Sequence, residues 1–202
     1  RHGADPGDWA TAVKAIPVTL TSDKIVGDEG SVIYVERAFY TGSGRQCGSA
    51  LGSDSASQRV DVAAYAKNKS LKVYDQPRDV ECSDKCPLWP KRGEKSDCSW
   101  RAIVSMQLLD SPTFPSRTSH RTKSFYSIMS MIGSLNAISR ETNGVLAGIP
   151  LMFRQYLIDV RAAGTGEHRR IPIMSFDFDG SLSELRRLAM AELQSRENMN
   201  RA

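Results

Sequence analysis

The pattern of hydrophobic positions divides the chain into a strand-rich first half and a mixed second half. Residues 16–110 contain short runs rich in Val, Ile, Tyr and Thr, a composition typical of β-strands. Breaks rich in Gly, Ser and Asp separate these runs, and the segment Thr41–Gln58 is predicted to be a loop. The predicted strands are Ile16–Thr21, Ser31–Tyr40, Ser70–Tyr74 and Arg101–Leu109.

The second half of the chain alternates between helical and strand patterns. Apolar residues recur every three or four positions in Ser119–Arg140, which predicts a helix with one buried face, ended by Asn143 and Gly144. The Gly-rich segment 163–166 then separates two strand-like runs and predicts a hairpin. Ser181 and Glu184 form a capping box that starts a last helix after Asp179 and Gly180. The two hairpin strands are predicted at Leu151–Arg161 and Ile171–Phe178.

These elements predict an α+β fold: an antiparallel, β-rich N-terminal part with a cysteine zinc loop, then a central helix, a β-hairpin and a C-terminal helix. The 202 residues divide into a flexible N-terminus (1–15), a single domain (16–178) with its zinc loop at 82–98, and the C-terminal helix (179–202). No apolar run approaches the roughly 18 residues of a membrane span, and no signal peptide is evident at Arg1. A cytoplasmic protein of a host cell is therefore expected.

The four cysteines are the clearest candidate site. Cys82, Cys86 and Cys98 lie on one polar loop, and Cys47 lies upstream in the predicted Gly- and Ser-rich loop. Four thiolates about 2.3 Å from one ion make a closed, tetrahedral Zn²⁺ site, which holds a loop in place and does not activate water. Two alternatives stay open: His120 or His168 replaces Cys47 as the fourth ligand, or the four cysteines form two disulfides.

The net charge of +4 permits contact with a polyanion but does not require it. Basic residues gather on the cysteine loop, before the central helix and around the hairpin turn, where they can reach phosphates, and Trp89 and Trp100 could stack on bases. Ordinary solvated charges are the alternative interpretation. The residues predicted to contact nucleic acid are Lys85, Trp89, Lys91, Arg92, Lys95, Arg117, Arg121, Lys123, Arg169 and Arg170.

Motifs for catalysis are missing from the sequence. It contains no His-Glu-x-x-His, no Gly-x-Ser-x-Gly and no phosphate-binding Gly-x4-Gly-Lys-Ser/Thr. Asp177 and Asp179 could form a two-carboxylate nuclease site, but a strand that leads into a capped helix explains Asp179 and Gly180 better. The chain is therefore predicted not to be an enzyme.

The order of motifs after the cysteine loop resembles a known family. The loop carries Cys82–Leu88 and Cys98, a strand follows, then Thr118 and Ser119 at the entry to a helix. Ser134–Ile138 and Thr142–Leu151 come next, before the hairpin. This order resembles the recombination directionality factors of phages and mobile elements, over Cys82 to Phe178, with Thr142–Leu151 as the most specific part.

The resemblance implies a non-catalytic partner of a recombinase. Such factors bind a large serine integrase on its DNA and shift it from integration towards excision, which is a population shift through differential binding. The resemblance also implies that Cys82, Cys86 and Cys98 match the metal loop of the family. Gly144–Pro150 has a local explanation too, as a corner between helix and hairpin. The alternative functions are a protein that binds or anneals single-stranded DNA, or a disulfide-bonded exported structural protein.

Overall fold

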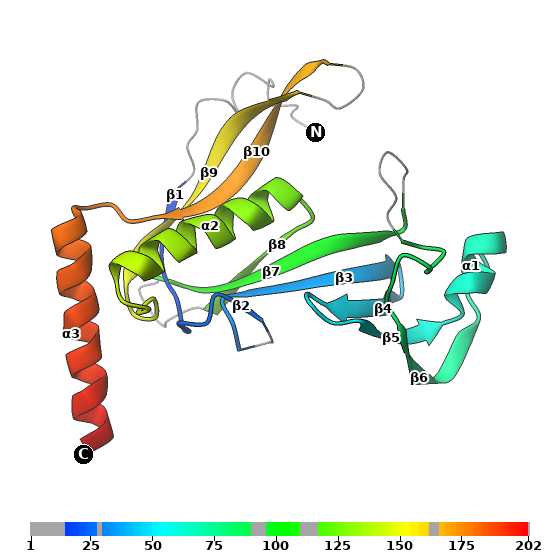
Figure 1. The fold of residues 1–202 in the computed structure, drawn as a ribbon, viewed down its shortest axis with the longest axis horizontal. Helices are drawn as coiled ribbons and strands as arrows, with labels where there is room; N and C mark the ends of the chain where they lie inside the picture. The colour runs from blue at the N-terminus through cyan, green and yellow to red at the C-terminus, as the bar shows by residue number, and fades with distance from the viewer. Residues whose placement is uncertain (1–14, 28–29, 90–95, 110–116, 162–165, 202) are drawn as a thin grey trace.

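A computed structural model describes residues 15–27, 30–89, 96–109, 117–161 and 166–201. Over these residues the chain forms one ten-stranded sheet and three helices, which is the predicted α+β class (Figure 1). The strands are β1 (Ala15–Thr19), β2 (Val26–Gly27), β3 (Ile33–Thr41), β4 (Gly44–Ala50), β5 (Ser55–Val60), β6 (Val73–Glu81), β7 (Cys98–Leu108), β8 (Arg117–Thr122), β9 (Pro150–Arg161) and β10 (His168–Asp177). The helices are α1 (Val62–Asn68), α2 (Phe125–Glu141) and α3 (Leu182–Arg201).

The sheet branches at the long inner strand β7. Strand β8 pairs along one edge of β7. Strands β3 and β1 share the other edge of β7. There the Ser105 N–H donates to Val32 O, just before β3, and the Leu109 N–H donates to Pro17 O in β1. Two wings follow, β3-β4-β5-β6 and β1-β9-β10, and they diverge in Figure 1. All strand pairs are antiparallel except β2 with β3.

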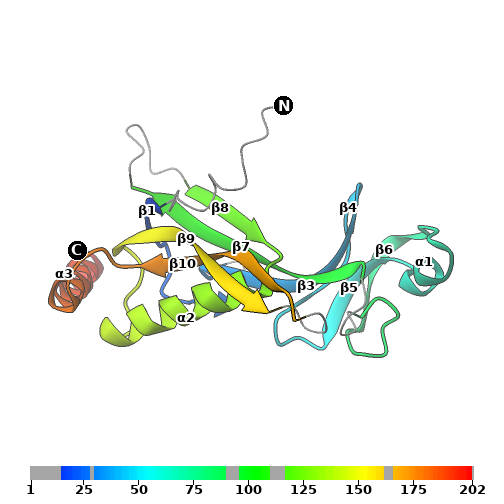
Figure 2. The same cartoon turned by 90° about the horizontal axis from the view of Figure 1, so that it is seen from above.

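The main core lies between α2 and the sheet. The apolar stripe of α2 is buried against β3 and β7, which supply Ile33, Val35, Ala102 and Val104. These strand residues alternate with exposed or half-buried ones, so one face of the sheet is covered by α2 (Figure 2). A smaller second cluster, formed by Phe39, Val60, Val62 and Leu88, lies at the other end of β3. The α2 stripe consists of Ile128, Met131, Leu135 and Ile138.

Two serines of α2 close the free edge of β10. The Ser127 Oγ accepts the N–H of Met174 at 3.3 Å, and the Ser134 Oγ accepts the N–H of Phe176 at 3.1 Å. Pro172 is the next residue on that edge, and proline has no N–H to offer a further strand. The edge that α2 covers is therefore protected against pairing with another chain.

The segment that follows α2 turns a tight corner and anchors α3. Gly144 and Gly148 take φ angles of +90° and +84°, a region that favours glycine. The Asp23 carboxylate accepts the N–H groups of Leu146 and Ala147 at 2.7 and 2.8 Å, and Arg196 of α3 donates to the same carboxylate at 2.5 Å. Burial alone raises the pKa of Asp23, but these hydrogen bonds outweigh it and hold the pKa below 3.8.

Several sequence predictions need correction: helix α1 was not predicted, and the strand predicted at Ser70–Tyr74 begins only at Val73 and runs to Glu81. The predicted loop Thr41–Gln58 contains β4 and part of β5, whose small and polar side chains lack a strong strand pattern. The predicted helix Ser119–Arg140 begins only at Phe125, after the Ser124 N-cap, because residues 117–122 pair with β7 as β8. Residues 1–14 of the predicted flexible N-terminus lie outside the described residues, and Ala15 already belongs to β1. None of the described helices combines the length and the apolar composition needed to cross a membrane.

Candidate metal centre and nucleic-acid interface

Two of the four cysteines lie on strands on either side of Phe39. In the sheet Phe39 of β3 opposes Cys47 of β4 on one side and Cys98 of β7 on the other. Residues in register across antiparallel strands point to the same face, so both thiols lie beside the buried Phe39 ring. Cys47 in β4 and Cys98 at the start of β7 are therefore strand residues and do not lie in loops as predicted, and Phe39 of β3 lies between them.

The other two cysteines belong to the segment that follows β6. The Cys82 N–H donates to Asp54 O at 2.7 Å, and the Cys86 N–H donates to Ser83 O at 3.0 Å and closes a turn. Cys47, Cys82 and Cys86 together line a cavity of about 340 Å³. Cys47, Cys86 and Cys98 also pack against the cluster around Phe39, and Cys82 shares the cavity with Cys47 and Cys86.

The cysteine loop is fastened at both of its ends. Leu88 is buried in the second cluster, and its carbonyl accepts a hydrogen bond from Ser96 Oγ at 2.6 Å. The same hydroxyl accepts the N–H of Cys98 at 3.1 Å. Between these anchors, residues 90–95 lie outside the described part of the chain, and with them the predicted contacts Lys91, Arg92 and Lys95.

The four cysteines are free thiols, each partly buried. Burial, followed by the neighbouring thiolates of Cys47, Cys86 and Cys82, raises the pKa of Cys98 to about 12. Burial, then Cys86 and Cys82, raises the pKa of Cys47 to about 11. The surroundings of Cys47 and Cys98 therefore oppose ionisation of these two thiols. Across the described ranges, no three Cys, His, Asp or Glu side chains are yet arranged as a metal-binding group.

Neither histidine considered as an alternative ligand lies with the cysteines. His120 of β8 opposes Val104, six residues along β7 from Cys98, which is about 20 Å in a strand. Its ring packs 5.3 Å from that of Phe153, and burial lowers its pKa. His168 opposes Arg161 at the far end of the β9–β10 hairpin.

An arginine between two tryptophans ties the cysteine loop to the sheet. The Arg37 guanidinium of β3 lies 3.4 Å from the ring centroid of Trp89 and 4.3 Å from that of Trp100. Its Nε is buried and finds no hydrogen-bond partner among the described residues. One face of each indole therefore contacts Arg37, which gives both rings a structural role beside the predicted stacking on bases.

Replacing Arg37 by alanine should destabilise the protein by about 1–2 kcal/mol, because two cation–π contacts at a partly desolvated site are lost. Arg78 of β6 provides a matched control: its guanidinium lies 4.0 Å from the Tyr74 ring centroid, but the residue is exposed. Urea unfolding of Arg37→Ala and Arg78→Ala measures both effects. An equal loss of unfolding free energy in the two variants would contradict a special role for Arg37 between Trp89 and Trp100.

The predicted basic contacts separate onto three elements. Arg117 and Arg121 are exposed on the same face of β8, and Lys123 follows at its end. Lys85 lines the cysteine cavity. Arg169 and Arg170 are neighbours on β10 and point to opposite faces of the hairpin. This hairpin projects from the body of the protein in Figure 1. Arg169 pairs with Glu167 at 2.7 Å, and Arg170 pairs with Asp159 at 3.3 Å.

The two aspartates considered for a nuclease site share one arginine. Arg154 contacts Asp177 at 3.5 Å and Asp179 at 3.2 Å. The Tyr156 hydroxyl also donates to Asp177. These contacts compensate the carboxylates and hold the end of β10 in place before α3 begins.

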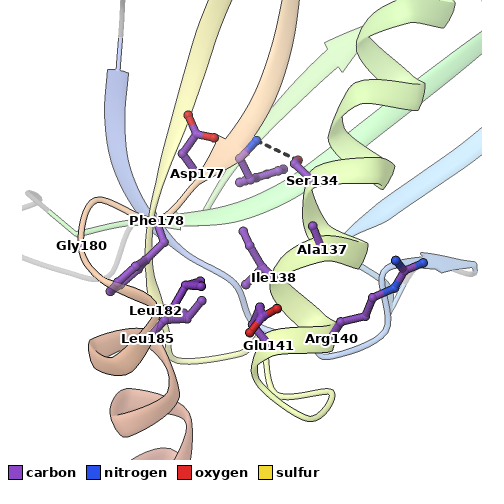
Figure 3. Close-up of a pocket in the computed structure, with 11 residues that line it drawn as sticks. Ser134, Ala137, Ile138, Arg140, Glu141, Asp177, Phe178, Gly180, Leu182 and Leu185 are labelled. Atoms are coloured by element: carbon purple, nitrogen blue, oxygen red, sulfur yellow. Dashed lines mark hydrogen bonds between the residues drawn. The ribbon is translucent and has the colours of Figure 1, made fainter.

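A cavity of about 490 Å³ lies where α2, β10 and α3 meet. Figure 3 shows Ile138 and Leu185 on its apolar side, with Asp177 and Glu141 at different parts of its rim. Both carboxylates have arginine partners, because Glu141 pairs with Arg186 at 2.5 Å. The two carboxylates at this cavity are therefore held in ion pairs.

A family model described as "Gp3-like: Recombination directionality factor-like" matches residues 3–179. The chain belongs to this family. No curated protein and no solved structure matches it. Membership confirms the resemblance drawn from the motifs and extends it from Cys82–Phe178 to nearly the whole sheet.

The match to the Gp3-like family ends just before α3. This helix is held by the ion pairs of Arg196 with Asp23 and of Arg186 with Glu141, and by burial of Leu185. The segment Thr142–Leu151 forms the predicted corner between α2 and the hairpin. Asp23 stabilises this corner by accepting two of its backbone N–H groups. Asp23 carries no local sequence signal of this role, because its partner Leu146 lies more than a hundred positions away.

Arg37 was also missed, although its position carried a signal. Along β3 the residues Ile33, Val35, Arg37 and Phe39 alternate onto the core face. An arginine in such a series needs a partner that shields its charge, and aromatic rings are one such partner. Trp89 and Trp100 were noted for stacking on bases, and the same property could have indicated Arg37.

Proposed function

We propose that this protein is a non-catalytic, zinc-stabilised accessory factor that binds a serine integrase on its DNA and shifts it from integration towards excision. The observation that carries the proposal is membership of the recombination directionality factor-like family over residues 3–179. A factor of this kind needs no reacting groups of its own, since it acts by binding one conformation of the recombinase more tightly than another.

The cysteine cluster supports a structural role for Zn²⁺ in this proposal. Cys47, Cys82, Cys86 and Cys98 supply four soft donors, and two come from strands while two come from the loop. A cation would relieve the cost of ionising thiols whose pKa values are raised. Zn²⁺ would then hold the loop against β3, β4 and β7 and fix the surface that the loop presents to a partner.

The test is a recombination assay with the integrase of the same element. We expect the protein to promote recombination between the two junctions that flank an integrated element, and to inhibit the integration reaction at a similar ratio of protein to integrase. The protein alone should neither recombine nor cut either substrate. An integrase whose direction is unchanged over a wide range of ratios would reject the proposal.

The same preparation distinguishes the alternative of a single-strand binder. A strand-annealing protein binds oligonucleotides without a partner and loses affinity steeply with salt. The stacking of Trp89 and Trp100 on Arg37 leaves less aromatic surface for this mode. Tight binding to single strands with no effect on the integrase would favour that alternative.

A further inference from the structure

The sheet face opposite α2 carries a strip of cationic side chains. Because side chains alternate along a strand, Glu36 and Tyr40 of β3, Arg101 of β7 and the exposed arginines of β8 all point away from the core. In register, Glu36 opposes Arg101, and Ile103 opposes Arg121. The buried apolar residues of α2 and α3 join the core on the other side of the sheet, and Val62 of α1 packs in the second cluster with Phe39.

A pocket of about 300 Å³ opens on this face, lined by Tyr40, Arg101, Arg121 and Lys123. The Arg101 guanidinium lies 3.6 Å from the centroid of the Tyr40 ring, which holds it in a fixed direction. The Nε of Arg101 is buried and lacks a hydrogen-bond partner within the described part of the chain. A buried, unpaired donor of a guanidinium is costly unless an acceptor reaches it.

The one carboxylate in this pocket is already bound by other groups. Glu36 is 2% exposed; its Oε1 accepts the Tyr40 hydroxyl at 2.6 Å and its Oε2 pairs with Arg45 at 3.1 Å. Glu36 therefore forms its ion pair with Arg45 and not with the cations of the pocket. Within the described residues, Arg101, Arg121 and Lys123 form no ion pair. Arg117 and Arg121 continue the positive strip along β8 and lie four residues apart, about 13 Å along the strand.

We propose that this face binds the DNA backbone, with one phosphate group held in the pocket by Arg101 and Lys123, and with Arg117 and Arg121 contacting phosphates along β8. Planar guanidinium groups on a rigid sheet suit phosphate oxygens. The inference rests on the proposed function insofar as the polyanion is the DNA on which the integrase acts. Contacts of this kind position a protein on DNA without reading its sequence.

The test is fluorescence anisotropy with a labelled DNA duplex carrying the recombination site, in salt from about 50 to 200 mM. The double variant Arg117→Gln/Arg121→Gln should bind about tenfold more weakly at low salt, and its plot of log K against log salt should be shallower by about 2. Arg101→Gln should lower the slope by about 1. Both β8 residues are exposed, so the double variant is expected to melt like the wild type.

The control is Arg169→Gln/Arg170→Gln, which removes the same charge from the hairpin; because these arginines already pair with Glu167 and Asp159, they are expected to contribute less to DNA affinity than the β8 arginines. The inference is overturned if this control loses as much affinity as the β8 variant, or if the wild type fails to bind duplex DNA at about 50 mM salt. The recombination assay separates the two proposals. A wild type that redirects the integrase while the β8 variants bind DNA normally rejects only the phosphate site, and a β8-dependent DNA binder without effect on the integrase rejects only the proposed function.

Discussion

Protein purified in the presence of zinc and a reductant is expected to contain about one Zn²⁺ per chain, and replacing Cys98 by serine should abolish that binding. Serine offers no thiolate, and three ligands hold the ion far less well than four. At a zinc concentration about 1,000-fold above Kd, binding to the folded state alone stabilises it by about 4 kcal/mol. Metal analysis and thermal unfolding with and without a chelator measure both effects.

The matched control for the zinc prediction is Ser99→Ala, one residue further along β7. Ser99 opposes Ala38 and points to the opposite face of the sheet, so this variant should keep its zinc. Wild-type protein treated with a chelator should behave like Cys98→Ser. Absence of metal, combined with altered migration on a non-reducing gel, would instead establish the disulfide alternative and reject the zinc site.

Zinc binding should also move the tryptophans. Cys47 and Cys98 lie on strands two positions apart, about 9.6 Å between backbones, with Phe39 between them. Two sulfur atoms bound to one ion lie close together, so zinc binding is expected to draw the thiols of Cys47 and Cys98 towards each other. Trp89 and Trp100 pack on Arg37 at this point, and their fluorescence is expected to change when zinc is added.

Replacing Phe176 by alanine should destabilise the protein by about 3–5 kcal/mol, the usual cost of deleting a buried aromatic ring. Phe176 is 1% exposed, packs 5.1 Å from the ring centroid of Phe153, and lines the cavity beneath α3 beside Leu185. Its backbone N–H also donates to Ser134 of α2. One side chain thus joins the hairpin, α2 and α3, and denaturant unfolding measures its contribution.

Phe125 provides the control for this prediction. It stands at the start of α2 and is 59% exposed. Phe125→Ala removes the same atoms from a surface position and should change the free energy of unfolding by no more than about 0.5 kcal/mol. Similar losses in both variants would mean that the hairpin and α3 do not depend on the buried ring.

Much of the fold could be predicted because its signals were local. The stripe that buries Ile128, Met131 and Leu135 repeats with the period of a helix, and Ser181 caps α3 through the N–H of Glu184 as the capping box indicated. The hairpin followed from two strand-like runs around a Gly-rich turn. The family also followed from the order of motifs, which the match over residues 3–179 confirms.

The missed strands β4 and β8 have weak local patterns and strong distant partners, whereas helix α1 was missed although Asp61 caps it locally. Strand β4 around Cys47 is built of small and polar residues, and it forms because β3 and β5 offer hydrogen bonds on both sides. Strand β8 was assigned to the helix because its polar residues lead directly into a helical pattern, whereas β7 holds it in the sheet. Propensity could not identify these strands, since neighbouring strands decide their conformation.

The sequence alone determined the α+β class, the central helix, the hairpin and the capped last helix. It also indicated the family and led to the hypothesis that the four cysteines act together. The tertiary structure decided which residues share a face. It placed Cys47 and Cys98 on either side of Phe39, Arg37 between two indoles, and Arg101 beside Lys123. Sequence periodicity reports which side of its own element a residue occupies, but the partner across the sheet depends on register and branching, which arise only when distant strands pair.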